Sequence, residues 1–124
     1  MTVNASISFT VTERSSDRVV SEMPISSSIR NPYGVVHAGA MLWMADVTAT
    51  VLVMGRENVA ESGAGFPLAI SLNASFLSNQ RDGLLKAVAT FVKRGRTVSV
   101  VRTVVYGVDD KLIADVTTSH VLSK

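Results

Sequence analysis

The sequence predicts an α+β fold in which one curved antiparallel β-sheet wraps around a single long, buried helix. The supporting observations are alternating apolar and polar residues before position 26, an almost wholly apolar segment over residues 38–55, and four strand-like segments after residue 66. One sheet curling around that helix is the economical way to bury it on nearly every side. With 124 residues the chain has room for one domain, which we expect to span residues 1–124.

The strands are predicted from alternation and turn chemistry. The first strand is expected to be half-buried, with every second residue facing inward: Ile7, Phe9 and Val11. A turn at residues 15–17 leads to a second strand over residues 18–25, followed by a loop over 26–33. The four remaining strands are expected over residues 67–77, 84–93, 97–106 and 112–122.

The central segment predicts a buried helix over residues 38–55. It is apolar on almost every face, and Gly55 is a plausible C-terminal stop. A membrane span is the alternative, but a central Asp46 would cost roughly 2.5–3.5 kcal/mol there. The flanking sequence is also strongly β, so we expect a core helix with Trp43 and the methionines packed inside. Residues 56–66, with Gly63 and Gly65, are expected to form a loop.

The composition excludes several kinds of site. The chain has no cysteine, which rules out disulfides, thiolate chemistry and Cys-ligated zinc. With two histidines, neither a metal site nor another cofactor is expected. Charged residues make up 18% of the chain, below the roughly 25% of typical domains, which points to a surface partly covered in an oligomer. No apolar signal segment is visible in residues 1–20, so a cytoplasmic location is expected by default.

Basic side chains gather in one part of the chain. The net charge of +2 is too slight to indicate nucleic-acid binding. Two interpretations of the local excess remain open: a phosphorylated ligand, or strand edges protected by charge. The segment between Arg81 and Arg102 holds a single acid, Asp82, against Arg81, Lys86, Lys93, Arg94, Arg96 and Arg102.

Asp46 is the strongest candidate for chemistry. It is the only ionisable residue between His37 and Arg56. A charge on a buried helix must be partnered, protonated or exposed to a cleft. It is therefore either a functional carboxylate or a structural one that meets water or an arginine at a subunit contact.

A second candidate is the turn of residues 31–39, which leads into the helix. Free N–H groups at a helix start can hold an anion or a developing oxyanion. The small residues Ala38 and Gly39 would let a carbonyl approach them, and the Asn31 amide could orient a water or a carbonyl. Asp46 lies about 12 Å further along the helix than Ala38. Both can serve one site only if two protomers contribute, which predicts a homodimer with two shared sites.

The pattern Asn31-x-x-Gly34-x-x-His37-Ala38-Gly39, with Asp46 nine residues after the histidine, resembles hotdog-fold thioesterases of the phenylacetic-acid-pathway (PaaI) type. The resemblance extends over nearly the whole chain. It implies that Asp46 is the nucleophile or the general base for water. It also implies that the Ala38 N–H polarises the thioester carbonyl, that Asn31 positions water or carbonyl, and that His37 braces the loop. Two positions depart from the family pattern: Ala38 replaces a glycine, and Ala69 stands where some relatives carry a catalytic hydroxyl.

The resemblance also implies a coenzyme A site. The alternative interpretation of the basic residues in this site is an ordinary hairpin turn with charged flanks. His120 is expected at the surface. The implied substrate-binding residues are Phe76, Ser78, Arg81, Arg94, Gly95, Arg96 and Thr97.

The expected function is hydrolysis of an acyl-CoA thioester by a homodimer or a dimer of dimers, with no nucleic-acid or membrane partner. A non-catalytic acyl-CoA-binding module and a hydratase or dehydratase of the same fold remain as alternatives.

Overall fold

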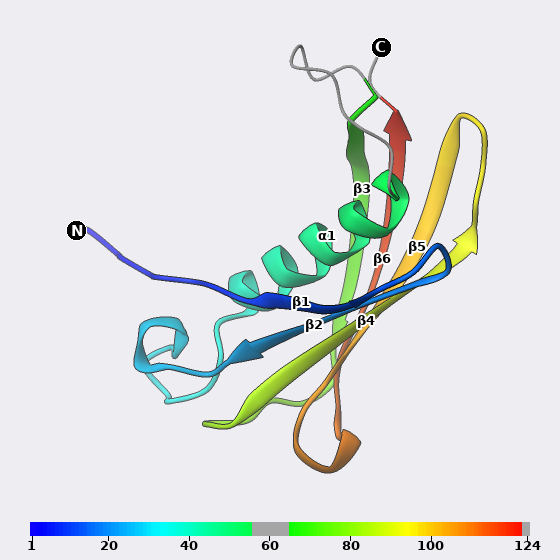
Figure 1. Cartoon of the computed structure of the whole chain (residues 1–124). Helices are drawn as coiled ribbons and strands as arrows, with labels where there is room; N and C mark the ends of the chain where they lie inside the picture. The colour runs from blue at the N-terminus through cyan, green and yellow to red at the C-terminus, as the bar shows by residue number, and fades with distance from the viewer. Residues whose placement is uncertain (56–64, 123–124) are drawn as a thin grey trace.

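The computed structural model describes residues 1–55 and 65–122, and within them it contains one α-helix and six strands. The helix is α1 (Ala38–Met54), which lies across one face of a curved sheet (Figure 1). The strands are β1 (Thr10–Arg14), β2 (Arg18–Pro24), β3 (Pro67–Phe76), β4 (Leu84–Lys93), β5 (Val98–Tyr106) and β6 (Leu112–Leu122).

All strand pairs are antiparallel, in the order β1-β2-β4-β5-β6-β3. The crossover from β2 through α1 to β3 carries the chain from one half of the sheet to the far edge, and α1 packs against every strand from β2 to β6. The predicted helix-wrapped sheet is therefore confirmed. Each of the five expected strands after residue 17 lies within one residue of its expected bounds at either end.

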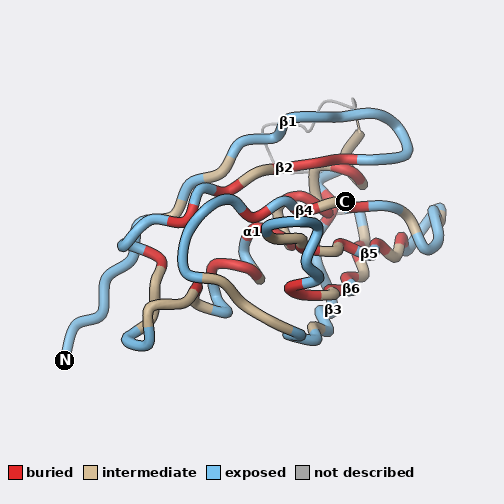
Figure 2. Tube along the Cα trace, turned by 90° about the horizontal axis from the view of Figure 1, so that it is seen from below, coloured by how far each residue is buried: buried red, intermediate tan, exposed pale blue. Residues whose placement is uncertain are grey.

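The first strand differs from its prediction. It begins at Thr10, so Ile7 and Phe9 precede it, and all five of its residues are exposed (Figure 2). Ile7 and Phe9 do pack against the core, and the Phe9 ring meets the Trp43 ring edge-on at 4.9 Å. The alternation therefore marks a segment that anchors the N-terminal region on α1, while Val11 lies outside the core.

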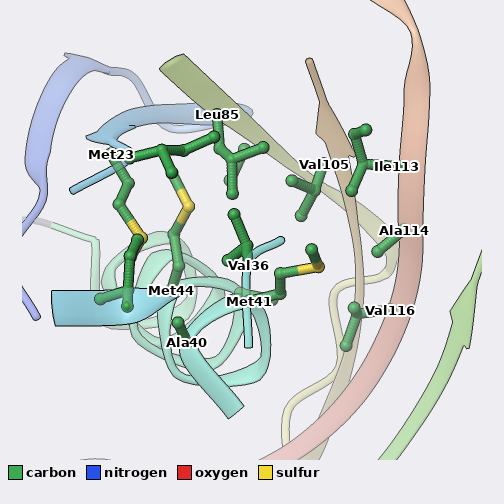
Figure 3. Close-up of a cluster of buried hydrophobic side chains, with 14 residues drawn as sticks. Met23, Val36, Ala40, Met41, Met44, Leu85, Val105, Ile113, Ala114 and Val116 are labelled. Carbon is green, nitrogen blue, oxygen red and sulfur yellow. The ribbon is translucent and has the colours of Figure 1, made fainter. Parts of the chain in front are cut away.

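The core lies between one face of α1 and the inner face of the sheet. Met41 and Met44 from the helix meet Met23, Leu85 and Val105 from the strands (Figure 3). The described residues cover the opposite face of the helix only in part, and Trp43, expected in the core, is 42% exposed. The helix is thus apolar on more faces than the described residues fully bury.

The helix ends as predicted. Gly55 follows Met54 with φ +61 and donates its N–H to the Val51 carbonyl at 3.1 Å. A residue without a side chain adopts this positive φ at little cost, which explains a glycine at the helix end. The predicted loop of residues 56–66, including Gly63, lies mostly outside the described residues. No described helix is long and apolar enough to span a membrane.

Candidate active site

Asp46 lies in the middle of α1 and faces a cavity of about 280 Å³. The cavity lies between the helix and the start of β3. The Oδ1 atom of Asp46 is buried and has no hydrogen-bond partner among the described residues. The other lining side chains are almost all apolar: Val47, Thr50, Val51, Met54, Phe66, Pro67, Leu68 and Ala69. A buried carboxylate oxygen without a partner is costly for folding alone, and such exceptions concentrate at functional sites.

Asn31 organises the turn that leads into the helix. Its Oδ1 accepts hydrogen bonds from the N–H groups of Tyr33 at 2.9 Å and Val35 at 3.3 Å. Its backbone carbonyl accepts the Gly34 N–H at 2.9 Å, and its own N–H donates to Val35. The side-chain oxygen is therefore engaged in shaping the loop, and only the Nδ2 group of the amide remains to meet a substrate or a water.

Gly34 and Arg81 lie against each other in the same turn. Gly34 has φ +82, and a Cβ atom built there would lie 2.5 Å from the Arg81 Nη1. That guanidinium nitrogen donates to the Tyr33 carbonyl at 2.9 Å. Arg81 therefore fixes the turn within this chain, and its predicted contact with the coenzyme stays a prediction.

Asn79 is a residue that sequence reasoning missed. Its carboxamide makes two hydrogen bonds to the backbone of Val36, immediately before His37. Asn79 lies in the connection between β3 and β4, so nothing in the local sequence around the turn indicates the contact.

The start of α1 keeps two free donors. His37 caps the helix with extended backbone and donates its N–H to the Ile29 carbonyl at 2.9 Å, which ties the loop to the residues before it. The N–H groups of Ala40 and Met41 both donate to the His37 carbonyl. Within the part of the chain that the structure describes, the N–H groups of Ala38 and Gly39 have no partner.

Ala38 is compatible with this arrangement. Among the described non-glycine residues, positive φ occurs only at Asp109 and Asp110. Because Ala38 begins the helix with a negative φ, its Cβ does not displace the backbone donor. The departure from the glycine of the family pattern therefore leaves the N–H in place.

The structure does not bring the helix start and Asp46 together within one chain. Both lie on the straight helix α1, eight residues apart, which is about 12 Å along its axis. The Asp46 cavity contains no residue of the 31–39 turn.

The predicted coenzyme residues fall into two groups at opposite ends of β4. Phe76 is exposed, Ser78 donates its hydroxyl to the Leu112 carbonyl at 2.6 Å, and Arg81 holds the turn. The other group lies beyond the far end of the strand, about 30 Å away at 3.3 Å per residue. One chain therefore cannot apply both groups to one small ligand.

The second group surrounds the end of the helix. Arg94, Gly95 and Thr97 line a cavity of about 310 Å³ together with Met54 and His120. Arg94 contacts the Ser16 carbonyl, lies 3.7 Å from Asp17 and stacks over Phe91 at 4.3 Å.

Other basic residues of the segment are split between the two interpretations. Arg102 pairs with Asp115 through two hydrogen bonds of 3.0 and 2.6 Å, and this contact holds the pKa of the Asp115 carboxyl below its usual value. Arg96 is exposed and makes no ion pair with any described residue. Arg102 thus fits the structural interpretation, while Arg96 is free to meet a ligand.

His120 does not lie at the surface as expected. It is 1% exposed, on the inner face of β6, and its Nε2 lies 2.8 Å from the Thr118 hydroxyl. Burial lowers the pKa of the imidazole, against smaller opposing effects of the Pro67 backbone and the Asp46 carboxylate. Within residues 1–55 and 65–122, no three His, Asp or Glu side chains gather as a metal site requires.

Comparison with known proteins decides the family. A model of the thioesterase superfamily matches residues 33–114, which is more than half of the chain. The chain belongs to the thioesterase superfamily. It is therefore a thioester hydrolase in its general class, which favours hydrolysis over the binding-module and hydratase alternatives.

Individual relatives are more distant. ComA2 of Bacillus subtilis, named as a candidate esterase, is 28% identical over 103 residues, which cover 83% of this chain and 79% of that protein. A mutant thioesterase of Staphylococcus aureus has the same fold, with a TM-score of 0.84 at 20% identity, covering 94% of this chain and 93% of the other. A hypothetical thioesterase of Streptococcus pneumoniae, solved with coenzyme A, has a TM-score of 0.81 at 17% identity, covering 94% and 86%.

Proposed function

We propose that the protein is an acyl-CoA thioesterase of the PaaI type in which Asp46 is the reacting carboxylate. The observation that carries the proposal is the Asp46 Oδ1, which is buried without a partner in an otherwise apolar cavity. The cavity lining suits an acyl or aryl group, because apolar walls with few polar groups are typical of such sites. With the acyl group in this cavity, the Asp46 carboxylate would lie next to the thioester carbonyl carbon.

Two chemical routes are open to this carboxylate. As a general base, Asp46 takes a proton from water while the water oxygen bonds to the thioester carbon. As a nucleophile, it bonds to that carbon itself, and water then hydrolyses the resulting anhydride. In both routes the carbonyl oxygen becomes negative, the C–S bond breaks, and coenzyme A leaves as the thiolate and takes up a proton.

The developing oxyanion needs donors that the Asp46 cavity lacks. The unpartnered N–H groups of Ala38 and Gly39 have the required chemistry, helped by the positive end of the helix dipole. Because they are about 12 Å from Asp46 along the helix, we assign the oxyanion donors of each site to a second protomer.

The surface around β3 supports such a dimer. β3 is an edge strand of ten residues, and its exposed apolar side chains include Leu68, Ile70 and Leu72. A long, exposed apolar edge is a template for pairing with another chain, and natural proteins cover it. Pairing two copies through β3 about a two-fold axis would place the α1 helices of both copies beside each other.

The coenzyme portion would be held by basic side chains. Arg96 and Arg94 lie beyond the far end of β4, and Arg81 lies at the helix start. In a dimer with antiparallel helices, the end of α1 in one copy would lie near the start of α1 in the other, so the β4–β5 turn of one copy and Arg81 of the other could serve the same site. The Streptococcus pneumoniae relative solved with coenzyme A supports a ligand of this class.

The deciding experiment is Asp46→Asn, assayed by thiol release from a panel of acyl-CoA esters. We expect a loss of roughly 10²–10⁴-fold in kcat with folding intact, because a general base is removed without a change in shape. Asp82→Asn, at an exposed position, is the matched control and should keep full activity. Activity of Asp46→Asn within a few fold of the wild type would exclude the catalytic assignment.

A further inference from the structure

His120 is buried beside the proposed site, and the proposed function does not use it. It lies on β6, and its Cα pairs with that of Ala69 on β3. Ala69 lines the Asp46 cavity, and so does Pro67, whose backbone is near enough to act on the imidazole. Met54 lines both this cavity and the one that His120 borders. His120 and Asp46 therefore border neighbouring cavities, one from the sheet and the other from the helix.

Both residues carry an unsatisfied polar atom there. Of the described side chains, only Asp46 Oδ1, His120 Nδ1 and Thr103 Oγ1 are buried with no hydrogen-bond partner. A folded protein normally satisfies such atoms with protein groups or ordered water. Among the described residues, Asp46 is the only charged group whose field acts on the His120 imidazole. The two side chains are thus electrostatically coupled.

The side chain between them is small. Ala69, whose Cα pairs with that of His120, carries only a methyl group, and it lines the Asp46 cavity next to the cavity that His120 borders. A water needs two to four polar partners to be held in place, and these two orphaned atoms can supply two of them.

We propose that His120 Nδ1 and Asp46 Oδ1 together hold the water that attacks the thioester, which makes His120 a positioning residue. The inference rests on the proposed function and selects its general-base route. In the proposed arrangement the proton of the neutral imidazole is on Nε2, which lies 2.8 Å from the Thr118 hydroxyl and donates to it, and Nδ1 is then an acceptor. One water hydrogen points to Nδ1 and the other to Asp46, so a lone pair of the water oxygen is free to attack. The proton goes to Asp46, and His120 keeps its own.

Two substitutions separate the two nitrogens of the ring. In His120→Asn the amide occupies the place of Nδ1, and in His120→Gln it reaches the place of Nε2. We expect His120→Asn to keep kcat within a few fold. We expect His120→Gln to lower kcat by about 10- to 100-fold with little change in KM, because the water loses its orientation. A purely structural histidine, anchored through Thr118, predicts the reverse order.

A second measurement does not depend on activity. The protein has two histidines, so the His120 resonance is assigned in NMR spectra by comparison with His120→Gln. In Asp46→Asn the pKa of His120 should fall further, because the carboxylate that favours the imidazolium is gone. An unchanged His120 titration would overturn the proposed contact, and so would equal kcat in the Asn and Gln variants. If the titration shifts but no acyl-CoA ester releases thiol, the contact stands and the proposed function fails.

Discussion

Asn79 holds both backbone polar groups of Val36: its Oδ1 accepts the Val36 N–H at 3.2 Å, and its Nδ2 donates to the Val36 carbonyl at 2.9 Å. Val36 is itself buried, so water cannot satisfy its backbone N–H and carbonyl groups. The contact imitates a strand pair and links the β3–β4 connection to the turn before α1. The direction in which the free helix N–H groups point therefore depends on a residue 43 positions away.

The first prediction concerns this contact. Asn79→Ala should lower kcat by about 10-fold or more, because the oxyanion donors lose their fixed position. It should also reduce the free energy of unfolding by about 1–3 kcal/mol, since a buried N–H and carbonyl lose their partner. Chemical denaturation and thiol release measure the two effects. Asn79→Asp keeps the acceptor for the Val36 N–H, so its kcat and its free energy of unfolding should lie between those of the wild type and Asn79→Ala. An equal loss in both variants would show that the acceptor is unimportant.

The second prediction concerns the basic segment. Arg96 is the cleaner test of coenzyme binding, because Arg94 also contacts the Ser16 carbonyl, Asp17 and Phe91 within its own chain. Arg96→Glu should raise KM for acyl-CoA esters, because the new carboxylate repels the phosphates of the coenzyme. KM for short thioesters should not change, because they carry no phosphate. The increase should shrink at high salt.

Arg102→Gln is the comparison for that experiment, because Arg102 is already paired with Asp115 on the sheet. It should leave KM unchanged for both substrate classes. If Arg96→Glu impairs simple thioesters as strongly as acyl-CoA esters, the arginine has a structural role and the hairpin interpretation is correct.

The third prediction concerns pH and the buried imidazole. The pKa of His120 lies below its ordinary value of 6.5 because burial disfavours the charged ring. The unfolded chain then takes up a proton near pH 6.5, while the folded protein does so only at lower pH. The free energy of unfolding should therefore fall as the pH drops below 6.5, and level off once the folded-state pKa is passed. His120→Gln should remove this part of the pH dependence; an identical profile in both proteins would contradict the shifted pKa.

Much of the fold could be predicted from the sequence because its signals are local. The apolar run of α1 and the turn residues between β4, β5 and β6 are each visible in a short window. The motif of the 31–39 turn is also local, since the Asn31 side chain bonds to residues two and four positions later.

What could not be predicted depends on register and on distant contacts. The pairing of Ala69 with His120 follows from the long β3–β6 register, which shifts at a bulge between Ala69 and Ser71. A shift by one residue would turn His120 to the outer face, so its burial is invisible to a local pattern. Asn79 and Arg81 likewise act on a turn more than forty residues earlier. Ile7 and Phe9 have the alternating pattern of a strand because their side chains pack on the core beside α1, although both residues precede β1 and lie outside the sheet.

The last prediction tests the shared site, and it needs two inactive variants. Asp46→Asn removes the carboxylate. Gly39→Val blocks the helix start, and a Cβ at Gly39 meets nothing within 4 Å, so the backbone should accept it without unfolding. Each homodimer should be nearly inactive, because every site then lacks either its carboxylate or its donors.

Mixing and re-equilibrating the two variants should restore activity. About half of the dimers become heterodimers, and under two-fold symmetry each of these has one site with both lesions and one with neither. The mixture should therefore recover about a quarter of the wild-type activity. Subunit exchange is verified by native mass spectrometry, and mixing Asp46→Asn with itself gives the background. A mixture that exchanges subunits and yet stays inactive would place the oxyanion donors in the same chain as Asp46. Subunit exchange can restore an intact site only when the carboxylate and the donors of that site come from different protomers.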